Sequence, residues 1–509
     1  RTQEMIKRIW LIILSSGLMF FLFAALNPYG GQVAAKPLSQ WSPPQRIPGY
    51  EDDAEPPILI ADQNHTIHAF NYQQVGQGEK EIAIIYSQWS PEQGWTRPND
   101  VVLSPLKHEA RVMGAYLDPQ STMHLLFYGG DETEANIYYG SAPAARAGQT
   151  RAWSAPLAIG EAASSPSSAA LTGDGHGNLV AIYSGNLEGN GIYGIYSTDN
   201  GVTWSRPSYI YLTYSDVLFP WGLQLAIGPT GMHAIWNVVD MSGQGRTIYY
   251  AKFDLAEKSW SDPATLATSE SGLGVMHPAI IETDTNIFAV YIVTPKVVMR
   301  RSQDGGETWS EPIEPFGRHI GVNGTLSLVT DSAGELHLLW GQRIPGSPDI
   351  HGMWHSIWRD NSRWTEPEPV VSGPRVLDTT SDKGFDPFNA RAVISQGNVL
   401  LVTWRTDPGN IKPNGIWYSY TTLNTPELPV VALAAPPEPT PTTVPATPTP
   451  EPSPVSTLNT TAISVTAGGE ARAVTPDAPA SPLLVGILPV VMLLSAAFLF
   501  FGMQRRRRL

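Results

Sequence analysis

The sequence predicts an all-β protein built as a seven-bladed β-propeller. The chain has 16 Trp, 19 Tyr, 46 Gly and 45 Pro in 509 residues, a composition typical of short strands joined by many turns. A Trp motif recurs about every fifty residues, and strand-turn-strand patterns lie between its copies. A period of this length fits a propeller blade or a solenoid repeat, and the strand composition favours the propeller.

Seven Trp motifs mark the repeat, and neighbouring copies are 49 to 58 residues apart. They are "WSPP" at 41, "WTRP" at 95, "WSAP" at 153, "WSRP" at 204, "WSDP" at 260, "WSEP" at 309 and "WTEP" at 364. We expect each Trp to open the fourth strand of a blade. The first motif has no blade before it, and the last β-rich segment, 415–422, has no motif after it. Residues 41–47 are therefore expected to supply the outer strand of the blade formed by 389–422, which leaves no long free edge.

Two copies belong to a longer pattern, S-x-D-x-G-x-T-W, written "STDNGVTW" at 197–204 and "SQDGGETW" at 302–309. Asp and Gly suit a tight turn, because Asp bonds the nearby backbone and Gly adopts positive φ. We expect this turn to join the third and fourth strands of a blade and the Trp to pack between neighbouring blades. Asp199 and Asp304 are then turn residues and not catalytic ones.

On these motifs, residues 41–424 resemble the sialidase-like propellers that carry Asp-box repeats. The other five copies are eroded, as in "FDLAEKSW". The resemblance implies that the Asp-box is structural and lies on the face away from the usual binding site. Sialidases have six blades, so the seven counted here are a departure from that family.

The resemblance also implies an arginine site. Sialidase-like enzymes bind a substrate carboxylate with three arginines, use an Asp as acid/base and attack with a Tyr activated by a Glu. The segment 389–410 resembles the family's first blade, which makes Arg391 the first clamp, Arg405 its neighbour and Asp407 the acid/base. Ala392 and Val393 stand where the family has Ile-Pro, and Asp407 follows Arg405 closely, so the match is partial.

Further candidates lie in the loops that build the ligand face of a propeller. Arg111 gives a second partial match, with Asp131 or Glu132 on the returning loop. The candidate ligand-binding residues are Arg343, His277, Glu109 and the same Asp131. Glu55 also lies in a loop that leads into a first strand. No Tyr–Glu pair can be assigned from spacing, because the partners come from different blades.

Histidines recur at one position of the second strand: His68, His124, His233 and His337. A metal site or an acid/base ring would use such residues. Recurrence within a repeat is better explained by a shared structural role. No cofactor or metal is predicted, and the chain has no cysteine, which excludes disulfides and thiolate sites.

Both ends of the chain have the features of segments that enter or cross a membrane. Residues 1–35 have the layout of a secretory signal, with a basic start, an apolar run at 9–26 and small residues at 32–35; the run is also long enough to remain as an anchor. The expected order continues with the propeller at 36–424, a Pro/Thr-rich stalk at 425–482, a transmembrane helix at 483–503 and a basic cytoplasmic tail at 504–509. The propeller is thus expected outside the cell, on a single-pass membrane protein.

Three functions remain open from the sequence. The first is a surface module that recognises glycans without turnover, and the second is an exo-acting glycosidase of sialidase type that removes terminal sialic-acid-like sugars. The third is a propeller that only assembles protein partners. A nucleic-acid partner is disfavoured, because the formal net charge is -14 and phosphate binding needs clustered Lys and Arg.

Overall fold

The computed structural model describes residues 40–431, except 52–53, 76–80, 107–108, 132–133, 163–167, 271, 285, 344–350, 360–362, 374–386 and 407–414. The chain divides into two compact units, 1–435 and 436–509, and all described residues belong to the first. Among them, no helix is long and apolar enough to cross a membrane. The segments 9–26 and 483–503 lie outside the described residues, so both membrane predictions remain predictions.

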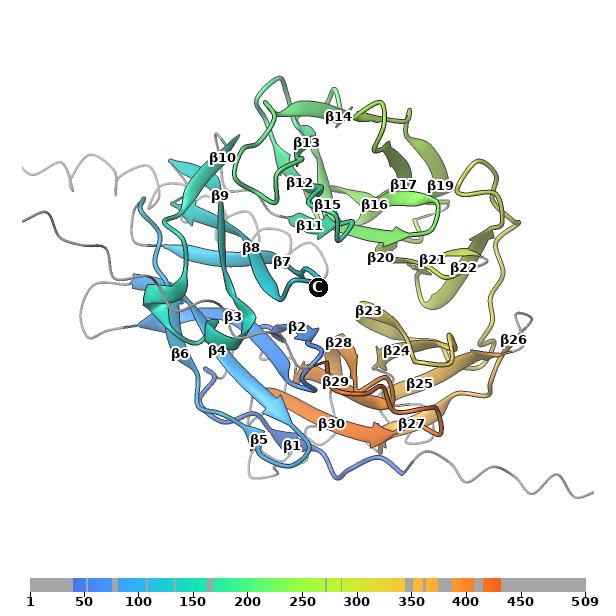
Figure 1. Cartoon of the computed structure of the whole chain (residues 1–509). Helices are drawn as coiled ribbons and strands as arrows, with labels where there is room; N and C mark the ends of the chain where they lie inside the picture. Colours follow the sequence, from blue (N-terminus) through green and yellow to red (C-terminus); the bar gives the residue numbers. More distant parts are fainter. Residues whose placement is uncertain are drawn as a thin grey trace, which may run out of the picture. The chain divides into compact units, whose positions relative to one another are not determined.

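The described part of the chain folds into seven antiparallel sheets arranged as a ring (Figure 1). We number them as blades in chain order. Blade 1 holds β2 (Ile58–Ala61), β3 (Ile67–Val75), β4 (Glu81–Ser90), β5 (Gly94–Trp95) and β6 (Asn99–Val102); blade 2 holds β7 (Ala110–Leu117), β8 (Thr122–Gly130), β9 (Ala135–Pro143) and β10 (Leu157–Ala162); blade 3 holds β11 (Ala169–Gly173), β12 (Leu179–Gly185), β13 (Gly191–Ser197) and β14 (Ser208–Leu212).

The second half of the ring repeats the plan. Blade 4 holds β15 (Leu218–Gly228), β16 (Gly231–Asp240), β17 (Gly245–Asp254), β18 (Ser259–Trp260) and β19 (Ala264–Thr268); blade 5 holds β20 (Val275–Glu282), β21 (Ile287–Val293) and β22 (Lys296–Ser302); blade 6 holds β23 (Val322–Thr330), β24 (Leu336–Gln342), β25 (Gly352–Arg359), β26 (Arg363–Trp364) and β27 (Glu368–Ser372); blade 7 holds β28 (Pro387–Ser395), β29 (Val399–Thr406), β30 (Ile416–Thr422) and β1 (Gln45–Arg46). Two one-turn 3-10 helices, η1 (Ala144–Arg146) and η2 (Thr150–Ala152), follow β9.

The ring closes as the sequence predicts. Strand β1 pairs with β30, with Gln45 opposite Tyr418 and Arg46 opposite Trp417, and Ile47 donates a backbone hydrogen bond to Ile416 at 2.8 Å. The first strand of each blade also contacts the first strand of the next blade around the whole circle, from β2 through β7, β11, β15, β20 and β23 to β28 and back to β2. The seven-bladed all-β propeller is therefore confirmed.

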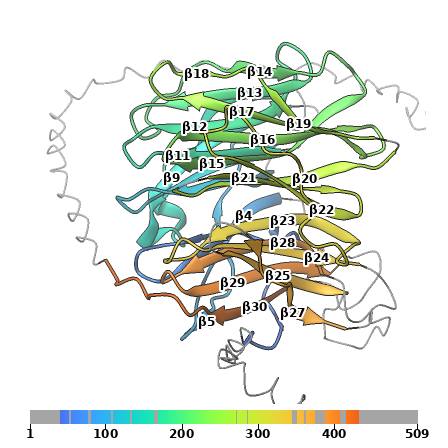
Figure 2. The ribbon, with the colours of Figure 1, turned by 90° about the vertical axis from the view of Figure 1, so that its right-hand side faces the viewer.

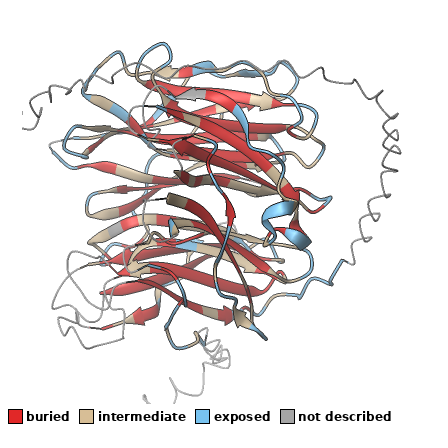
Figure 3. Cartoon of the chain, turned by 90° about the vertical axis from the view of Figure 1, so that its left-hand side faces the viewer, coloured by how far each residue is buried: buried red, intermediate tan, exposed pale blue. Residues whose placement is uncertain are grey.

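The hydrophobic core lies between the blades. The sheets stack face to face (Figure 2), and most of their strand residues are buried (Figure 3). One cluster joins Phe70 and Tyr86 of blade 1 to Leu125 and Phe127 of blade 2, and the other clusters repeat this arrangement around the ring. Each blade is thus stabilised by the side chains of both neighbours, since burial of apolar surface is the main favourable term in folding.

The motif tryptophans pack between blades, as predicted. Each one contacts a residue of the preceding blade, and six of these contacts have an aromatic, imidazole or thioether partner. The pairs are Trp41–His355, Trp95–Tyr418, Trp153–Phe70, Trp204–Tyr139, Trp260–Gly194, Trp309–Tyr250 and Trp364–Met299.

The prediction that each Trp opens the fourth strand is only partly right. In blades 1, 4 and 6 the Trp lies on a separate two-residue segment, β5, β18 or β26, that pairs with the third strand, and the longer fourth strand follows it. In blade 3 the Trp204 residue precedes the fourth strand, β14. The Pro that ends each motif explains the interruption, because it has no N–H for the ladder.

The two S-x-D-x-G-x-T-W segments form the same turn. In each, the Ser hydroxyl donates to the Asp carboxylate at 2.8 Å, and the Asp accepts bonds from the backbone N–H and the hydroxyl of the Thr. These hydrogen bonds, that from the Thr308 hydroxyl first, lower the pKa of Asp304 to about 2, and the matching bonds lower the pKa of Asp199. Both carboxylates therefore hold their turn and are not aimed at a ligand.

Each turn also packs against the preceding blade through the glycine of its motif. Gly306 has φ +94°, and a Cβ there would lie 1.8 Å from the Tyr250 hydroxyl; Gly201 has φ +88°, and its Cβ would lie 2.2 Å from the Tyr139 hydroxyl. Only glycine fits, because positive φ and close approach both exclude a side chain.

We predict that Gly306→Ala lowers the free energy of unfolding by about 2–4 kcal/mol, since the substitution adds backbone strain and overpacking. Gly334→Ala is the matched control: Gly334 has φ +77° with no atom within 4 Å of the added Cβ, so about 1 kcal/mol is expected. Denaturant unfolding of both variants checks this, and equal losses would mean that the contact with Tyr250 is unimportant.

The four recurring histidines are structural, as predicted. All four are buried, at 0–1% exposure. Nδ1 of His68, His124 and His233 lies 2.7 Å from a Tyr hydroxyl on the next strand, and in His337 the imidazole of His355 replaces the Tyr. Nε2 faces a carboxylate in every case: Asp62, Asp118, Glu282 and Asp331 respectively. A carboxylate only accepts, so Nε2 carries the proton and Nδ1 accepts from the Tyr.

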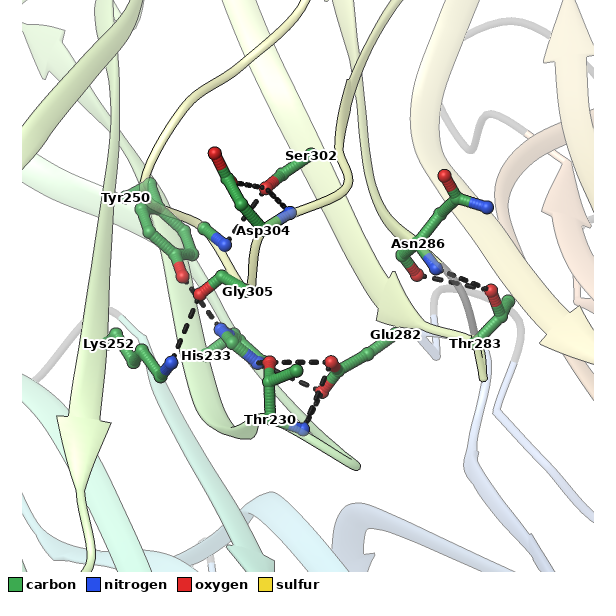
Figure 4. Close-up of polar contacts among 11 residues, drawn as sticks. Thr230, His233, Tyr250, Lys252, Glu282, Thr283, Asn286, Ser302, Asp304 and Gly305 are labelled. Atoms are coloured by element: carbon green, nitrogen blue, oxygen red, sulfur yellow. Dashed lines mark hydrogen bonds and ion pairs between the residues drawn. The ribbon is translucent and has the colours of Figure 1, made fainter.

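Blade 4 obtains its carboxylate from its neighbour. In the other three blades an Asp six residues before the His supplies it. The turn before His233 is shorter and has no Asp, and Glu282 of β20 reaches across from blade 5, at 3.0 Å from His233 and 2.6 Å from the Thr230 hydroxyl (Figure 4). Gly228 leaves room for it, because a Cβ there would lie 2.3 Å from a Glu282 oxygen.

These histidines predict a loss of stability in acid. Burial is the largest cause that lowers the pKa of His124, His233 and His337 in the folded chain. The unfolded chain therefore takes up protons near pH 6.5 that the folded chain does not, and the free energy of unfolding decreases as pH falls through that value. We expect the melting temperature to fall between pH 7 and pH 5, and to fall less steeply for His124→Gln. A melting temperature that is constant or rises over this range would contradict the prediction.

Candidate functional site

Three arginines from two blades surround one tyrosine of a third blade. Arg111 is the second residue of β7 in blade 2, while Arg391 and Arg405 lie on the paired strands β28 and β29 of blade 7. Tyr72 lies on β3 of blade 1, between those two blades, and its hydroxyl interacts electrostatically with all three guanidinium groups. The site is therefore built by blades 7, 1 and 2. We call Tyr72, Arg111, Arg391 and Arg405 the arginine cluster.

The strand directions explain why these residues meet. In the antiparallel pair β28–β29, Phe388 near the start of one strand lies opposite Arg405 near the end of the other. Arg111 near the start of β7 lies opposite Tyr128 near the end of β8 in the same way. The first strands all begin, and the second strands all end, at one face of the ring, which is the ligand face of a propeller.

Glu55 fixes the blade 7 side of the cluster. It lies in the loop before β2, and its carboxylate contacts the Arg405 guanidinium and accepts a hydrogen bond from the Asn389 side chain at 2.7 Å. Its backbone carbonyl accepts from the Asn71 side chain at 2.6 Å. Glu55 thus ties blade 1 to blade 7 and neutralises one of the three arginines.

Arg111 is held by two aromatic rings and one carboxylate. Its guanidinium carbon lies 5.8 Å from the centre of the Tyr72 ring and 5.9 Å from that of Tyr128, within the range of cation–π attraction. It also forms an ion pair with Glu109, so these two candidate site residues, which were predicted separately, lie together. The Arg111 side chain is 43% exposed, which leaves part of the guanidinium open to the face.

Arg391 differs from Arg111 and Arg405 in that no carboxylate of the described residues forms an ion pair with it. The residue is exposed to solvent, and its guanidinium forms no hydrogen bond or ion pair with any described residue. Desolvation of the guanidinium by the surrounding protein is the largest cause, and it lowers the pKa of Arg391. The charges of Glu55 and Tyr72 act in the opposite direction. An arginine remains charged throughout the physiological range, so Arg391 presents a positive group with donors available for an anion.

Tyr72 is suited to donate a hydrogen bond and not to attack. Burial, the largest cause, raises the pKa of Tyr72, and Glu55 adds to the rise while the arginines oppose it. The phenol is therefore protonated at neutral pH. Both oxygens of the Glu55 carboxylate are occupied by Arg405 and Asn389, and among the described residues no carboxylate is hydrogen-bonded to the Tyr72 hydroxyl.

The remaining predicted site residues lie elsewhere or outside the described part. Asp407 lies outside the described residues. Asp131 accepts the backbone N–H of Glu134 and holds the turn after β8. Arg343 follows β24 in blade 6, and His277 is on β20 in blade 5 and lines a separate cavity. Tyr72 was not among the predicted residues, because no spacing in the sequence relates it to the arginines of two other blades.

Comparisons with known proteins leave the family of this chain open. No family model and no curated protein match the sequence.

Among solved structures, a polysaccharide lyase of family PL25, an ulvan lyase bound to -[GlcA(1-4)Rha3S]-, has 11% identity and a TM-score of 0.50 over 75% of this chain and 97% of its own. An α-L-arabinanase of Penicillium chrysogenum has 13% identity and a TM-score of 0.45 over 75% and 98%. A six-bladed lectin of Aleuria aurantia has 14% identity and a TM-score of 0.39 over 63% and 96%. These likenesses concern the fold alone, and the described residues form a seven-bladed β-propeller with three arginines gathered on one face.

Proposed function

We propose that this chain is a membrane-anchored extracellular propeller that binds glycans, and that the arginine cluster recognises the carboxylate of an acidic sugar. The observation that carries the proposal is Arg391, an exposed arginine whose guanidinium has no hydrogen bond or ion pair with a described residue, near Arg111 and the hydroxyl of Tyr72. Planar guanidinium groups match a carboxylate with paired hydrogen bonds. The turns at 197–204 and 302–309 follow the third strands β13 and β22, at the ends of the blades away from this face, and this supports the resemblance to sialidase-like propellers.

The extracellular setting rests on the sequence. The apolar run at 9–26 supports export, and the apolar run at 483–503 followed by four arginines supports an anchor with its C-terminus in the cytoplasm. The Pro/Thr-rich segment between body and anchor supports a stalk that holds the propeller away from the membrane.

Binding of the full chain to the α-methyl glycoside of N-acetylneuraminic acid and to the methyl ester of that glycoside tests the proposal. The ester keeps the ring and removes the charge. We expect the acid to bind at least ten times more tightly and its affinity to fall with added salt, because the contact is ionic. Equal affinities for acid and ester would contradict the proposal.

A hydrolase of sialidase type is the second candidate, and the proximity of Tyr72 to Glu55 favours it. The raised pKa of Tyr72 and the engagement of Glu55 by Arg405 and Asn389 favour binding without turnover, since a nucleophile needs an available base. A fluorogenic sialic-acid aryl glycoside, supplied to the full chain from pH 4 to 8, separates the two. We expect no release of the fluorophore; release that is lost in Tyr72→Phe would establish the hydrolase.

A further inference from the structure

A cavity lies on the same face of the ring as the arginine cluster, at the opposite side of the ring. It has a volume of about 600 Å³ and is lined by the ends of β12 and β16 and the starts of β15 and β20, in blades 3, 4 and 5. Its wall includes the aromatic residues Trp221 and Phe219, which are 44% and 37% exposed. Exposed aromatic rings at a concave site are typical of ligand binding.

Asn237 gives this cavity an unsatisfied polar group. Its side chain is fully buried, and neither the amide oxygen nor the amide nitrogen has a hydrogen-bond partner among the described residues. A buried polar group without a partner costs about 1–3 kcal/mol, and the large majority of such groups in native proteins are paired. Asn237 lines the cavity, and because both polar atoms are covered by protein, a bound molecule pairs with them once the side chain turns toward the cavity.

The local backbone is shaped around this amide. Trp221 lies opposite Asn237, and the register of the β15–β16 pair shifts directly after it. Gly222 in that bulge has φ +63°, and a Cβ there would lie 2.8 Å from the Asn237 amide oxygen. His277 at the other side of the cavity also has positive φ, +51°. Bulges and strained residues of this kind are concentrated at binding sites.

The cavity presents no free charge among its lining residues. Burial lowers the pKa of His277 to about 4, so its imidazole is neutral at physiological pH. The one carboxylate in the wall, Asp240, is bound by Arg246 and accepts hydrogen bonds from Ser242. The chemistry of the cavity is therefore an aromatic wall, a neutral imidazole and the primary amides of Asn186, Asn190 and Asn237.

We propose that this cavity is a second ligand site, which binds a neutral sugar ring stacked on Trp221 with adjacent hydroxyls hydrogen-bonded to Asn237. The C–H face of a pyranose matches an aromatic ring, and the amide offers an acceptor and two donors to a pair of hydroxyls. An acidic sugar has no counter-ion here. The site differs from the arginine cluster in blades and in charge, so it does not depend on the function proposed for that cluster.

Saturation-transfer NMR on the full chain, with the methyl glycosides of galactose, glucose, mannose and fucose, tests the proposal. We expect at least one of the four to bind and Trp221→Ala to weaken that binding at least tenfold. Tyr209→Ala is the matched control, because Tyr209 is an exposed aromatic of blade 3, at 53%, that does not line the cavity. It is expected to bind as the parent does.

A second variant separates binding from folding. Asn237→Leu removes the unsatisfied amide, so we expect the melting temperature to be unchanged or higher while the sugar signal is lost. The proposal is overturned if none of the four glycosides binds the folded chain, or if Trp221→Ala binds normally. Loss of binding in Arg391→Ala, with Trp221→Ala unaffected, would also overturn it and assign the neutral sugar to the arginine cluster.

Discussion

Arg391→Ala is expected to weaken binding of the α-methyl glycoside of N-acetylneuraminic acid about 30- to 150-fold while leaving the melting temperature unchanged. The Arg391 side chain forms no hydrogen bond or ion pair with any described residue, so its removal breaks no such contact that holds the fold. A lost charge-assisted contact at a ligand costs about 2–3 kcal/mol, which corresponds to that range of affinity. Isothermal titration of the parent and the variant measures it.

Two control variants accompany this prediction. Arg206→Ala removes an exposed arginine of the loop that precedes β14, outside the arginine cluster, and is expected to bind as the parent does. Arg391→Lys keeps the charge and removes the planar fork, so an intermediate affinity is expected. Unchanged affinity in Arg391→Ala would remove the residue from the site.

Glu282→Ala is expected to lower the free energy of unfolding by about 2–4 kcal/mol. Glu282 has a side chain that is 3% exposed, and it is the only described carboxylate that meets Nε2 of His233. Its loss leaves the His233 N–H and the Thr230 hydroxyl and N–H without their partner. The His233 N–H is buried, and a buried donor that loses its partner costs about 1–3 kcal/mol, whereas the exposed Thr230 groups can bond to water. Because Glu282 joins blade 5 to blade 4, denaturant unfolding is expected to show the loss as a lower midpoint for the whole ring.

Glu314→Ala is the control for this variant. Glu314 is 51% exposed and forms an ion pair with Lys296 at the surface, where such pairs contribute about 0–1 kcal/mol. A Glu282→Ala chain as stable as the Glu314→Ala chain would show that the contact between the two blades carries no stability.

The fold could be predicted because its determinants repeat along the chain. The Trp motif recurs with a nearly constant period, and the mismatch between its first and last copies indicated how Trp41 and the following strand close the ring. The recurring histidines were assigned a structural role for the same reason. Their hydrogen-bond partners were not predicted, and the substitution of Glu282 for a missing Asp could not be, because it joins residues 49 positions apart in sequence across two blades.

The two sites differ in how much of each could be predicted from the sequence. Arg111, Arg391 and Arg405 were selected by residue type and by resemblance, whereas their meeting point, Tyr72, depends on the side-by-side placement of blades 7, 1 and 2. The cavity at Trp221 depends on a shift of register after that residue and on the burial of one amide. His277 was selected as a candidate ligand residue from its loop, but nothing in the sequence relates it to Asn237.

The most direct test of the acidic-glycan proposal is a crystal structure of the propeller with N-acetylneuraminic acid bound. We expect the carboxylate to lie within hydrogen-bond distance of the Arg391 guanidinium, with Arg111 and the Tyr72 hydroxyl beside the sugar. A carboxylate bound away from all three arginines, or an arginine cluster that stays empty at saturating sugar, would contradict it.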